Sequence, residues 1–285
     1  MSRVTKLKEH VPVPLWDFAC RIFYSISDLF KSAQPQESLI PYCGYKLFFG
    51  RESDIAKRLD KNGRFEDEMC TKIARELNKK PNPIFLDVGA NIGLVSLSIA
   101  SRCPTAKIYA FEPGESQQKF LEKNVLSNGL ADRIVVNCFA AGEKDGKAQF
   151  SSHHPDFGSN DGFFDTHRAG RSFSTKTVEV EVKKLDTWWN EKGRPQVDVI
   201  KIDTEGAELL VLRGASRLIE RCHPVLFLEI SPLNLKVYPY THFDILKFLE
   251  NNSYSLYTLG DQPISRNNFD SILARGEVSF WAKSA

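Results

Sequence analysis

Short apolar runs alternate with longer amphipathic segments through the middle and the C-terminal half of the chain. The runs are bounded by turn residues and have strand length, so we predict buried strands at 84–88, 107–111, 133–139, 197–202 and 225–230. The segments between them have helical spacing, which predicts helices at 94–101, 116–127 and 208–219. This alternation predicts parallel strands joined by crossover helices. The chain then ends with a predicted helix at 243–251 and predicted strands at 254–259 and 278–282.

Further elements flank this alternation. Residues 42–50 predict a short strand or hairpin, and 147–151 can pair with 177–183 because both alternate with a period of two. We expect additional helices at 54–59, 65–77 and 185–191. Glu66, Asp67 and Glu68 crowd the start of the helix at 65–77, where acids favour the positive end of the helix dipole. The alternative is that one of these acids contacts a ligand across the mouth of the sheet.

The first 41 residues differ from the rest of the chain. Residues 1–14 are polar and contain prolines, whereas apolar residues recur with helical spacing from Leu15 to Phe30. We interpret this segment as a helix that packs on its own domain or on a second copy of the chain in a homo-oligomer. The alternative is an interfacial helix in peripheral contact with a membrane, but Asp17 and Asp28 dilute its positive charge. We therefore predict an N-terminal helical extension at 1–41 and one domain at 42–285.

Composition narrows the class of protein. The 285 residues are 42% hydrophobic and 26% charged, which is ordinary for a globular protein, and the net charge of +2 gives no nucleic-acid footprint. No apolar run approaches membrane-spanning length, and Pro12, Pro14 and Asp17 interrupt any signal-peptide core. The six cysteines are scattered without a C-x-x-C pair, so we expect reduced thiols and a cytoplasmic location.

A glycine loop directly follows the strand at 84–88. The sequence Asp87-Val88-Gly89-Ala90-Asn91-Ile92-Gly93 places an aspartate two residues before the first glycine. Gly89 and Gly93 allow a tight turn and the close approach of a ligand to the backbone. A dinucleotide fingerprint would have glycine where Asn91 stands, and a carboxylate beside the loop would repel a phosphate. The pattern instead suits S-adenosylmethionine (SAM), whose amino group or sulfonium an acid can meet.

The next two predicted strands end in residues that suit the ribose and the adenine of SAM. Glu112 and Pro113 follow the strand at 107–111, where a carboxylate can accept hydrogen bonds from both hydroxyls of a ribose. Ala140 follows the strand at 133–139 and leaves room for a flat adenine ring. A glycine loop combined with a distant acid is far more specific than either feature alone.

Charged residues also gather at the ends of two later strands. Lys201, Asp203 and Glu205 surround the end of the strand at 197–202 beside Gly206, and Glu229 lies at the end of the strand at 225–230. Charged groups that bracket a strand end beside a glycine suggest the floor of an active site.

The long polar loop from Ser152 to Lys176 joins the two strands of the predicted hairpin. A loop of this length within a compact domain is usually functional or disordered, and we interpret it as a lid on the substrate side. Its histidines, His153, His154 and His167, match no common ligand spacing, so we expect no metal site.

Together these motifs resemble the FkbM family of SAM-dependent methyltransferases. The resemblance covers roughly residues 65–230 and is carried by Phe85–Gly93, Ala110–Pro113, Leu185–Thr187, Ile200–Glu208 and Arg213–Ala215. It implies an α/β, Rossmann-like class I methyltransferase fold with a mostly parallel seven-stranded sheet, an antiparallel last strand and helices on both faces. It also implies methyl transfer to an oxygen, commonly a hydroxyl of a sugar, a polyketide or another small metabolite.

The resemblance also implies roles for residues of this chain. The loop from Asp87 to Gly93 would cradle the methionine part of SAM, Glu112 would hold the ribose, and Asp203 would face the methyl donor. The cofactor-binding candidates are therefore Asp87, Gly89, Ala90, Asn91, Gly93, Glu112, Pro113, Ala140 and Asp203.

A hydroxyl acceptor must lose its proton as the new bond forms. The candidate bases are Asp203, Glu205, Glu229 and the loop histidines, whereas Lys201 can orient the acceptor or stabilise a developing alkoxide. For Lys201 and Glu205 the alternative is a salt bridge at the edge of the sheet.

Two other functions stay open at this stage. One is a nucleotide-binding oxidoreductase of the NAD type, which Asn91 in place of glycine opposes. The other is a SAM-binding module without turnover, which the intact set of Asp87, Glu112 and Asp203 opposes.

Overall fold

In the computed structural model the described residues are 37–284, with gaps at 52, 54–57, 60–62 and 153–175. The chain divides into two compact units, residues 1–38 and 39–285, and nearly all described residues belong to the second. The helix expected at 15–30, most of the helix expected at 54–59 and nearly all of the expected lid lie outside the described residues.

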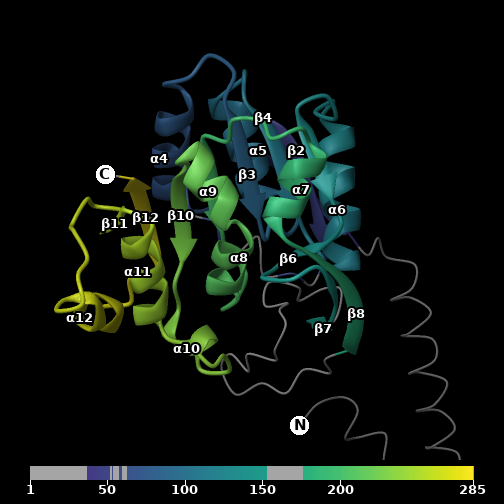
Figure 1. The fold of residues 1–285 in the computed structure, drawn as a ribbon. Coiled ribbons are helices and arrows are strands. Elements are labelled where there is room, and N and C mark those ends of the chain that lie inside the picture. The colour runs from purple at the N-terminus through teal and green to yellow at the C-terminus, as the bar shows by residue number, and fades with distance from the viewer. Residues whose placement is uncertain (1–36, 52, 54–57, 60–62, 153–175, 285) are drawn as a thin grey trace, which may run out of the picture. The chain divides into compact units, whose positions relative to one another are not determined.

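A seven-stranded sheet lies at the centre of the second unit (Figure 1). Its strands, in spatial order, are β11 (Tyr254–Thr258), β12 (Ser279–Ser284), β10 (Val225–Glu229), β9 (Val199–Ile202), β3 (Ile84–Val88), β4 (Lys107–Phe111) and β5 (Ile134–Asn137). β12 is antiparallel to both of its neighbours, and the other neighbouring pairs are parallel. The expected mostly parallel sheet with an antiparallel last strand is therefore confirmed.

Helices cover both faces of this sheet (Figure 1). Side chains alternate between the faces along each strand, so Phe85 of β3 faces one core and Leu86 faces the other. The first core contains α4 (Asp67–Leu77), α5 (Leu94–Arg102) and α6 (Glu115–Ser127). The second contains α7 (Leu185–Glu191), α8 (Glu208–Gly214), α9 (Ser216–Cys222) and α11 (His242–Asn251). No helix in the described part of the chain combines the length and the apolar character needed to cross a membrane.

Two smaller sheets accompany the large one. β1 (Glu37–Tyr42) pairs with β2 (Tyr45–Gly50), and a three-stranded sheet has the order β6 (Ala140–Ala141), β8 (Lys176–Lys183) and β7 (Gly146–Ser152). β7 and β8 are antiparallel, as expected from their alternating sequences.

Two elements of the structure differ from the prediction because of contacts between segments far apart in the chain. The single helix expected at 208–219 is two helices, α8 and α9, which meet at Ala215. A Cβ on Gly214 would lie 1.9 Å from the carbonyl oxygen of Gly142, so the chain passes very close to another loop at this break. The strand expected at 133–139 ends at Asn137, and Ala140 pairs with Val182 of β8 instead.

Smaller differences occur at three helices. The helix expected from Ser116 begins at Glu115, and Gly114 is its N-cap. The short helices α10 (Pro232–Leu235) and α12 (Phe269–Ala274) were not predicted. Both have fewer than two full turns, which is too short for a clear helical period.

The order of the strands creates a crevice at one edge of the sheet. From β3 the chain proceeds outward to β4 and β5, and it then returns to the other side of β3 as β9. Ligands of open α/β sheets bind at the carboxyl ends of the strands where the order reverses in this way. The fold therefore predicts a site between the ends of β3, β4 and β9.

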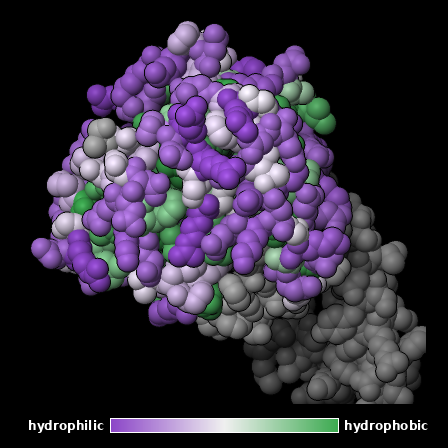
Figure 2. Space-filling model, in the orientation of Figure 1, coloured by the Kyte–Doolittle hydropathy of each residue, from purple (hydrophilic) through white to green (hydrophobic). Residues whose placement is uncertain are grey.

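Hydrophilic side chains dominate the face of the molecule in Figure 2, and the hydrophobic residues form areas that polar groups interrupt. The exposed large hydrophobic residues among those described are Leu39, Leu126, Leu233 and Val237. The expected homo-oligomer stays a prediction.

Candidate active site

A cavity lies at the carboxyl ends of β3, β4 and β9, where the strand order reverses. Apart from the loop histidines, which lie outside the described residues, the structure brings together here all but two of the residues expected at the site. Those in the cavity wall are Gly89, Ala90, Asn91, Glu112, Pro113, Ala140, Lys201, Asp203, Glu205 and Glu229. The two others, Asp87 and Gly93, lie outside the cavity wall.

The loop after β3 needs glycine because two strands approach each other closely there. Gly89 has a φ of 79°, and a Cβ on it would lie 1.8 Å from the carbonyl oxygen of Asp203. The N–H groups of Gly89 and Ala90 both donate to the carbonyl oxygen of Phe111 at 3.0 Å. These bonds tie the loop to β4, and the glycine lets it lie against β9.

Gly93 allows α5 to pack closely against α6 and does not line the cavity. It is the N-cap of α5 with a φ of 92°, and a Cβ on it would lie 2.7 Å from Cδ1 of Leu121 on α6. Asn91 also has a positive φ, 51°, which is uncommon outside glycine but several-fold enriched for asparagine. Its side-chain oxygen accepts a hydrogen bond from the N–H of Ile92 at 2.8 Å.

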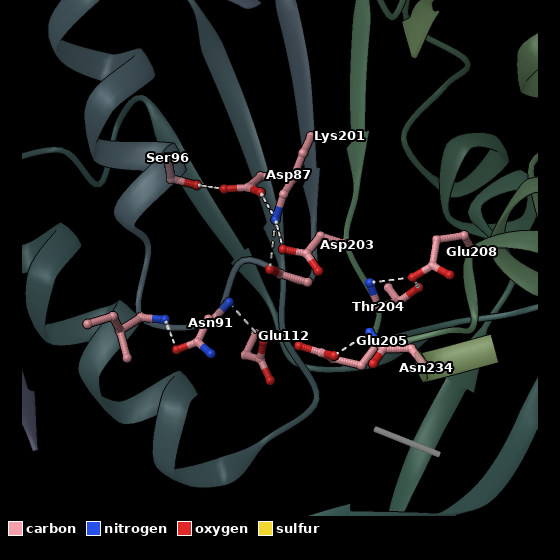
Figure 3. Close-up of polar contacts among 12 residues, drawn as sticks. Asp87, Asn91, Ser96, Glu112, Lys201, Asp203, Thr204, Glu205, Glu208 and Asn234 are labelled. Carbon is pink, nitrogen blue, oxygen red and sulfur yellow. Dashed lines mark hydrogen bonds and ion pairs between the residues drawn. The ribbon is translucent and has the colours of Figure 1, made fainter. Parts of the chain in front are cut away.

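Glu112 lies at the end of β4, and only 5% of its surface is exposed. Its Oε2 accepts a hydrogen bond from the N–H of Asn91 at 2.8 Å (Figure 3). Its Oε1 accepts one from the N–H of Gly114, also at 2.8 Å. A carboxylate can accept about four hydrogen bonds, so these two alone do not exhaust it. The backbone therefore fixes the orientation of the carboxylate at the place where a ribose is expected.

Lys201 lies between two aspartates (Figure 3). Its Nζ is 3.1 Å from Oδ2 of Asp203 and 3.7 Å from Oδ1 of Asp87, and it donates to the carbonyl oxygen of Gly89 at 3.3 Å. Oδ2 of Asp87 accepts a hydrogen bond from Oγ of Ser96 at 2.6 Å. Asp87 is fully buried, so it acts on the cavity through Lys201 rather than by forming part of its wall.

The opposite charges of Lys201 and the two aspartates offset the cost of burying them. Burial alone would lower the pKa of Lys201, but Asp203 and Asp87 outweigh it and hold that pKa above its usual value. Burial of Asp203 is likewise outweighed by Lys201 and by a side-chain hydrogen bond with Glu229, so the pKa of Asp203 lies below its usual value. Burial dominates at Asp87 and raises its pKa, although Lys201 and Ser96 oppose the rise. The ion pair of Lys201 with Asp203 is therefore the main charged unit in the cavity wall.

The turn after β9 explains the spacing of the motif from Asp203 to Glu208. Glu205 and Gly206 both have positive φ values, 53° and 105°. Oε1 of the buried Glu208 accepts a hydrogen bond from the N–H of Thr204 at 3.0 Å (Figure 3). It accepts another from the N–H of Gly206, also at 3.0 Å. A Cβ on Gly206 would lie 2.5 Å from the ring of Tyr238. Glu208 thus holds the turn from inside, and Glu205 points into the cavity.

Three carboxylates face one another at the ends of β9 and β10. Oxygens of Asp203, Glu205 and Glu229 lie within 4.8 Å of one another. Oε2 of Glu205 also accepts a hydrogen bond from Nδ2 of Asn234 on α10 at 2.7 Å. Carboxylates this close can share a proton or bind a divalent cation. The expectation of no metal stays a prediction.

The cavity wall also contains residues that the sequence did not point out. Arg58 and Phe65 precede α4, and Phe139 and Phe150 lie near the short strand β6 and in β7. Glu66 follows Phe65 and interacts electrostatically with Asp203 and Lys201. An aromatic residue at the end of a predicted strand was the available signal for Phe139. The other positions depend on contacts between segments far apart in the chain.

A match to a protein family shows which family this chain belongs to. A family model described as the methyltransferase FkbM domain matches residues 87–256, which is more than half of the chain. The chain belongs to the FkbM methyltransferase family. The resemblance seen in the motifs is therefore confirmed.

Three curated relatives are similar to this FkbM-family chain. The 2-O-methyltransferase NoeI of Sinorhizobium fredii is 26% identical over 51% of this chain and 62% of its own length. The methyltransferase sdnD of Sordaria araneosa is 30% identical over 51% and 64%. The 31-O-demethyl-FK506 methyltransferase FkbM of Streptomyces tacrolimicus is 27% identical over 47% and 60%. The chain thus spans less than two thirds of the length of each relative.

Solved structures resemble the fold. The crystal structure of methyltransferase FkbM from Methylobacillus flagellatus has a TM-score of 0.43 and 14% identity, and the match covers 80% of this chain and 56% of that one. A SAM-dependent methyltransferase from Agrobacterium tumefaciens has a TM-score of 0.46 and 9% identity, with 88% and 70% covered. These likenesses concern the fold alone.

Proposed function

We propose that this FkbM-family chain transfers a methyl group from SAM to a hydroxyl oxygen of a sugar, a polyketide or another small metabolite. The observation that carries the proposal is the cavity at the ends of β3, β4 and β9, which joins the glycine loop and Glu112 to the cluster of Asp203, Glu205 and Glu229. The first half suits a nucleoside, and the second suits an acceptor hydroxyl. The names of NoeI and of the Streptomyces relative also specify an oxygen.

The residues present fit SAM. The close approach at Gly89 leaves the backbone of the loop open toward the cavity, where a Cβ would collide with β9. Glu112 offers an oriented carboxylate for ribose hydroxyls, and Pro113 and Ala140 offer apolar surface for a ring. The acid-rich wall suits a ligand whose sulfonium and amino group are both positive.

When bound, SAM supplies a methyl group on a positively charged sulfur for attack by the acceptor oxygen. The chain must hold that oxygen in line at about 3 Å, and such alignment alone contributes several kcal/mol. The cluster of Asp203, Glu205 and Glu229 accepts the hydroxyl proton, because its oxygens lie together in the cavity wall. Lys201 holds Asp203 in its ionised form, which keeps a proton acceptor in place.

Membership of a methyltransferase family argues against the oxidoreductase that the glycine loop alone left open. The proposal retains a reducing, cytoplasmic location for the chain, because the five cysteines described in the structure are free thiols.

A transfer assay tests the proposal. The purified chain is incubated with SAM labelled in its methyl group and with a panel of sugars, polyketides and other hydroxylated metabolites. Labelled methyl on an oxygen of at least one compound, together with release of S-adenosylhomocysteine, would support the proposal. Transfer to nitrogen or carbon alone would contradict it. Binding of S-adenosylhomocysteine without transfer to any compound would favour a SAM-binding module without turnover.

A further inference from the structure

Glu66 occupies a backbone conformation that its position in the helix does not explain. It is the N-cap of α4, but its φ of 46° and ψ of 45° are left-handed, and its side chain makes no capping hydrogen bond. A non-glycine residue in this region is uncommon, and such strain concentrates at ligand sites. The next acid, Asp67, behaves as a helix-start residue should and pairs with Arg102 and Arg64. Supporting the helix dipole therefore accounts for Asp67 but not for Glu66.

The left-handed turn directs Glu66 away from solvent. Its Oε2 is buried and has no hydrogen-bond partner among the residues that the structure describes. A buried carboxylate oxygen normally has a partner, because leaving it without one is costly. The position therefore calls for a donor that the described part of the chain does not supply.

The charged groups around Glu66 show which strand ends it lies near. It interacts with Asp203, Lys201 and Asp87 at the ends of β9 and β3 and with Arg58 before α4. α4 packs against β9, and the neighbouring Phe65 is part of the cavity wall. Glu66 therefore lies near the charged groups at the ends of β9 and β3 and next to the cavity-wall residue Phe65, although Glu66 itself is not part of the cavity wall.

The cations near Glu66 are already engaged. Lys201 is shared by two aspartates and the carbonyl oxygen of Gly89, and the guanidinium of Arg58 lies 5.1 Å from the ring centre of Phe65. Asp87, which the sequence suggested for the amino group of SAM, accepts a hydrogen bond from Ser96 and lies 3.7 Å from Nζ of Lys201, behind the cavity wall. Next to the cavity-wall residue Phe65, Glu66 therefore offers a buried carboxylate oxygen that has no hydrogen-bond donor among the described residues.

We propose that the carboxylate of Glu66 binds the α-ammonium group of the methionine part of SAM. This assignment rests on the proposed function, because it requires the methionine part to lie along the glycine loop. An ammonium group supplies the hydrogen-bond donor that Oε2 lacks, and it brings positive charge to a region that holds Asp203 and Asp87 as well. In this assignment Glu66 binds the ligand's amino group, whereas Asp87 forms an ion pair with Lys201.

Three ligands separate this contact from the rest of the site. S-adenosylhomocysteine carries both the ammonium and the carboxylate, its decarboxylated form S-adenosyl-3-thiopropylamine carries the ammonium alone, and 5′-methylthioadenosine carries neither. Calorimetry should show that Glu66→Gln weakens the first two roughly 10- to 100-fold, the scale of hydrogen bonds to charged groups, and leaves the third within twofold. The exposed neighbour Glu68 provides the matched control, and Glu68→Gln should change none of the three affinities.

A second variant guards against a folding artefact. Glycine adopts a φ of 46° without strain, so Glu66→Gly should raise the melting temperature of the unliganded protein while it weakens S-adenosylhomocysteine binding. A purely structural Glu66 would move both quantities in the same direction.

The outcomes that overturn the proposal are distinct. Equal weakening of all three ligands by Glu66→Gln would mean that Glu66 shapes the pocket as a whole, and no weakening would mean that it makes no contact. Weakening of S-adenosylhomocysteine but not of the propylamine would place the contact on the carboxylate. If the wild-type chain binds none of the three, the proposed function fails together with this assignment, whereas wild-type binding that Glu66→Gln leaves unchanged overturns the assignment alone.

Discussion

The two halves of the cavity support their carboxylates by different means. On the β4 side, Glu112 is held by the backbone N–H groups of Asn91 and Gly114. On the β9 side, Asp203, Glu205 and Glu229 crowd together, and the buried Lys201 balances Asp203 and Asp87. The first half depends on backbone geometry and the second on a balance of charges. Removing a charge should therefore reduce stability most on the β9 side. Adding a side chain where the loop backbone packs closely should disturb both halves of the cavity.

The largest effect is expected from removing the central cation. Lys201→Met leaves Asp87 and Asp203 buried without their partner, so we expect a loss of about 3–5 kcal/mol in the free energy of unfolding, measured with urea. Lys147→Met breaks an exposed ion pair with Glu179 and serves as the control, with stability unchanged within error. A Lys201→Met variant as stable as this control would show that charge balance does not organise the β9 side.

Gly89→Ala tests the backbone contact that joins the halves. The new Cβ would meet the carbonyl oxygen of Asp203 at a φ of 79°, so we expect a loss of about 2–4 kcal/mol in unfolding free energy. Gly276 has a φ of 84° with no atom near its Cβ position, and Gly276→Ala measures the cost of positive φ alone. Equal losses for the two variants would mean that the loop can move away from β9.

Glu112→Gln addresses the β4 side. The variant keeps the shape but has one acceptor oxygen, so one of the two backbone N–H groups loses its partner, and it lacks the charge that strengthens bonds from ribose hydroxyls. We expect S-adenosylhomocysteine binding, measured by calorimetry, to weaken by about 1.5–3 kcal/mol. Glu115→Gln changes an exposed acid three residues later and should leave the affinity unaltered. An unchanged affinity in a folded Glu112→Gln protein would remove Glu112 from the ribose site.

The smallest expected effect is a pH dependence of ligand binding. Burial and the charge of Asp203 raise the pKa of Glu66 to about 7, although Lys201 and Arg58 oppose the rise and Asp87 adds to it. A cationic ligand favours the ionised carboxylate, so affinity should rise as the pH rises from about 6 to 8 and then level off. We expect a gain of about 1 kcal/mol, which Glu66→Gln should abolish. An affinity that is constant or falls over this range would contradict the ionisation of Glu66 on binding.

The sequence predicted residues on both sides of the cavity, but it did not predict the contacts between segments far apart in the chain. The loop from Asp87 to Gly93 and the acid at Glu112 follow strands with clear apolar runs, so local patterns placed them at one edge of the sheet. The break between α8 and α9 depends on the approach of Gly214 to Gly142, which no local pattern encodes.

The sequence suggested that one of three acids contacts a ligand, but it did not single out Glu66, to which we assign the proposed role. The sequence presented three consecutive acids at a helix start, and only the left-handed turn distinguishes the inward Glu66 from Asp67, which pairs with arginines. Asp87 shows the converse, since a conspicuous motif residue lies behind the cavity wall. Burial and the sign of φ decided both cases, and both arise from packing between distant segments.

Parallel calorimetric titrations of the full chain with S-adenosylhomocysteine and with NAD test the central claim most directly. The cavity combines a glycine loop that lacks the middle glycine of a dinucleotide site with an acid-rich wall that repels a pyrophosphate. We predict binding of S-adenosylhomocysteine with a Kd in the micromolar range or below and no measurable heat with NAD. Binding of NAD together with no response to S-adenosylhomocysteine would contradict the assignment of this cavity to SAM.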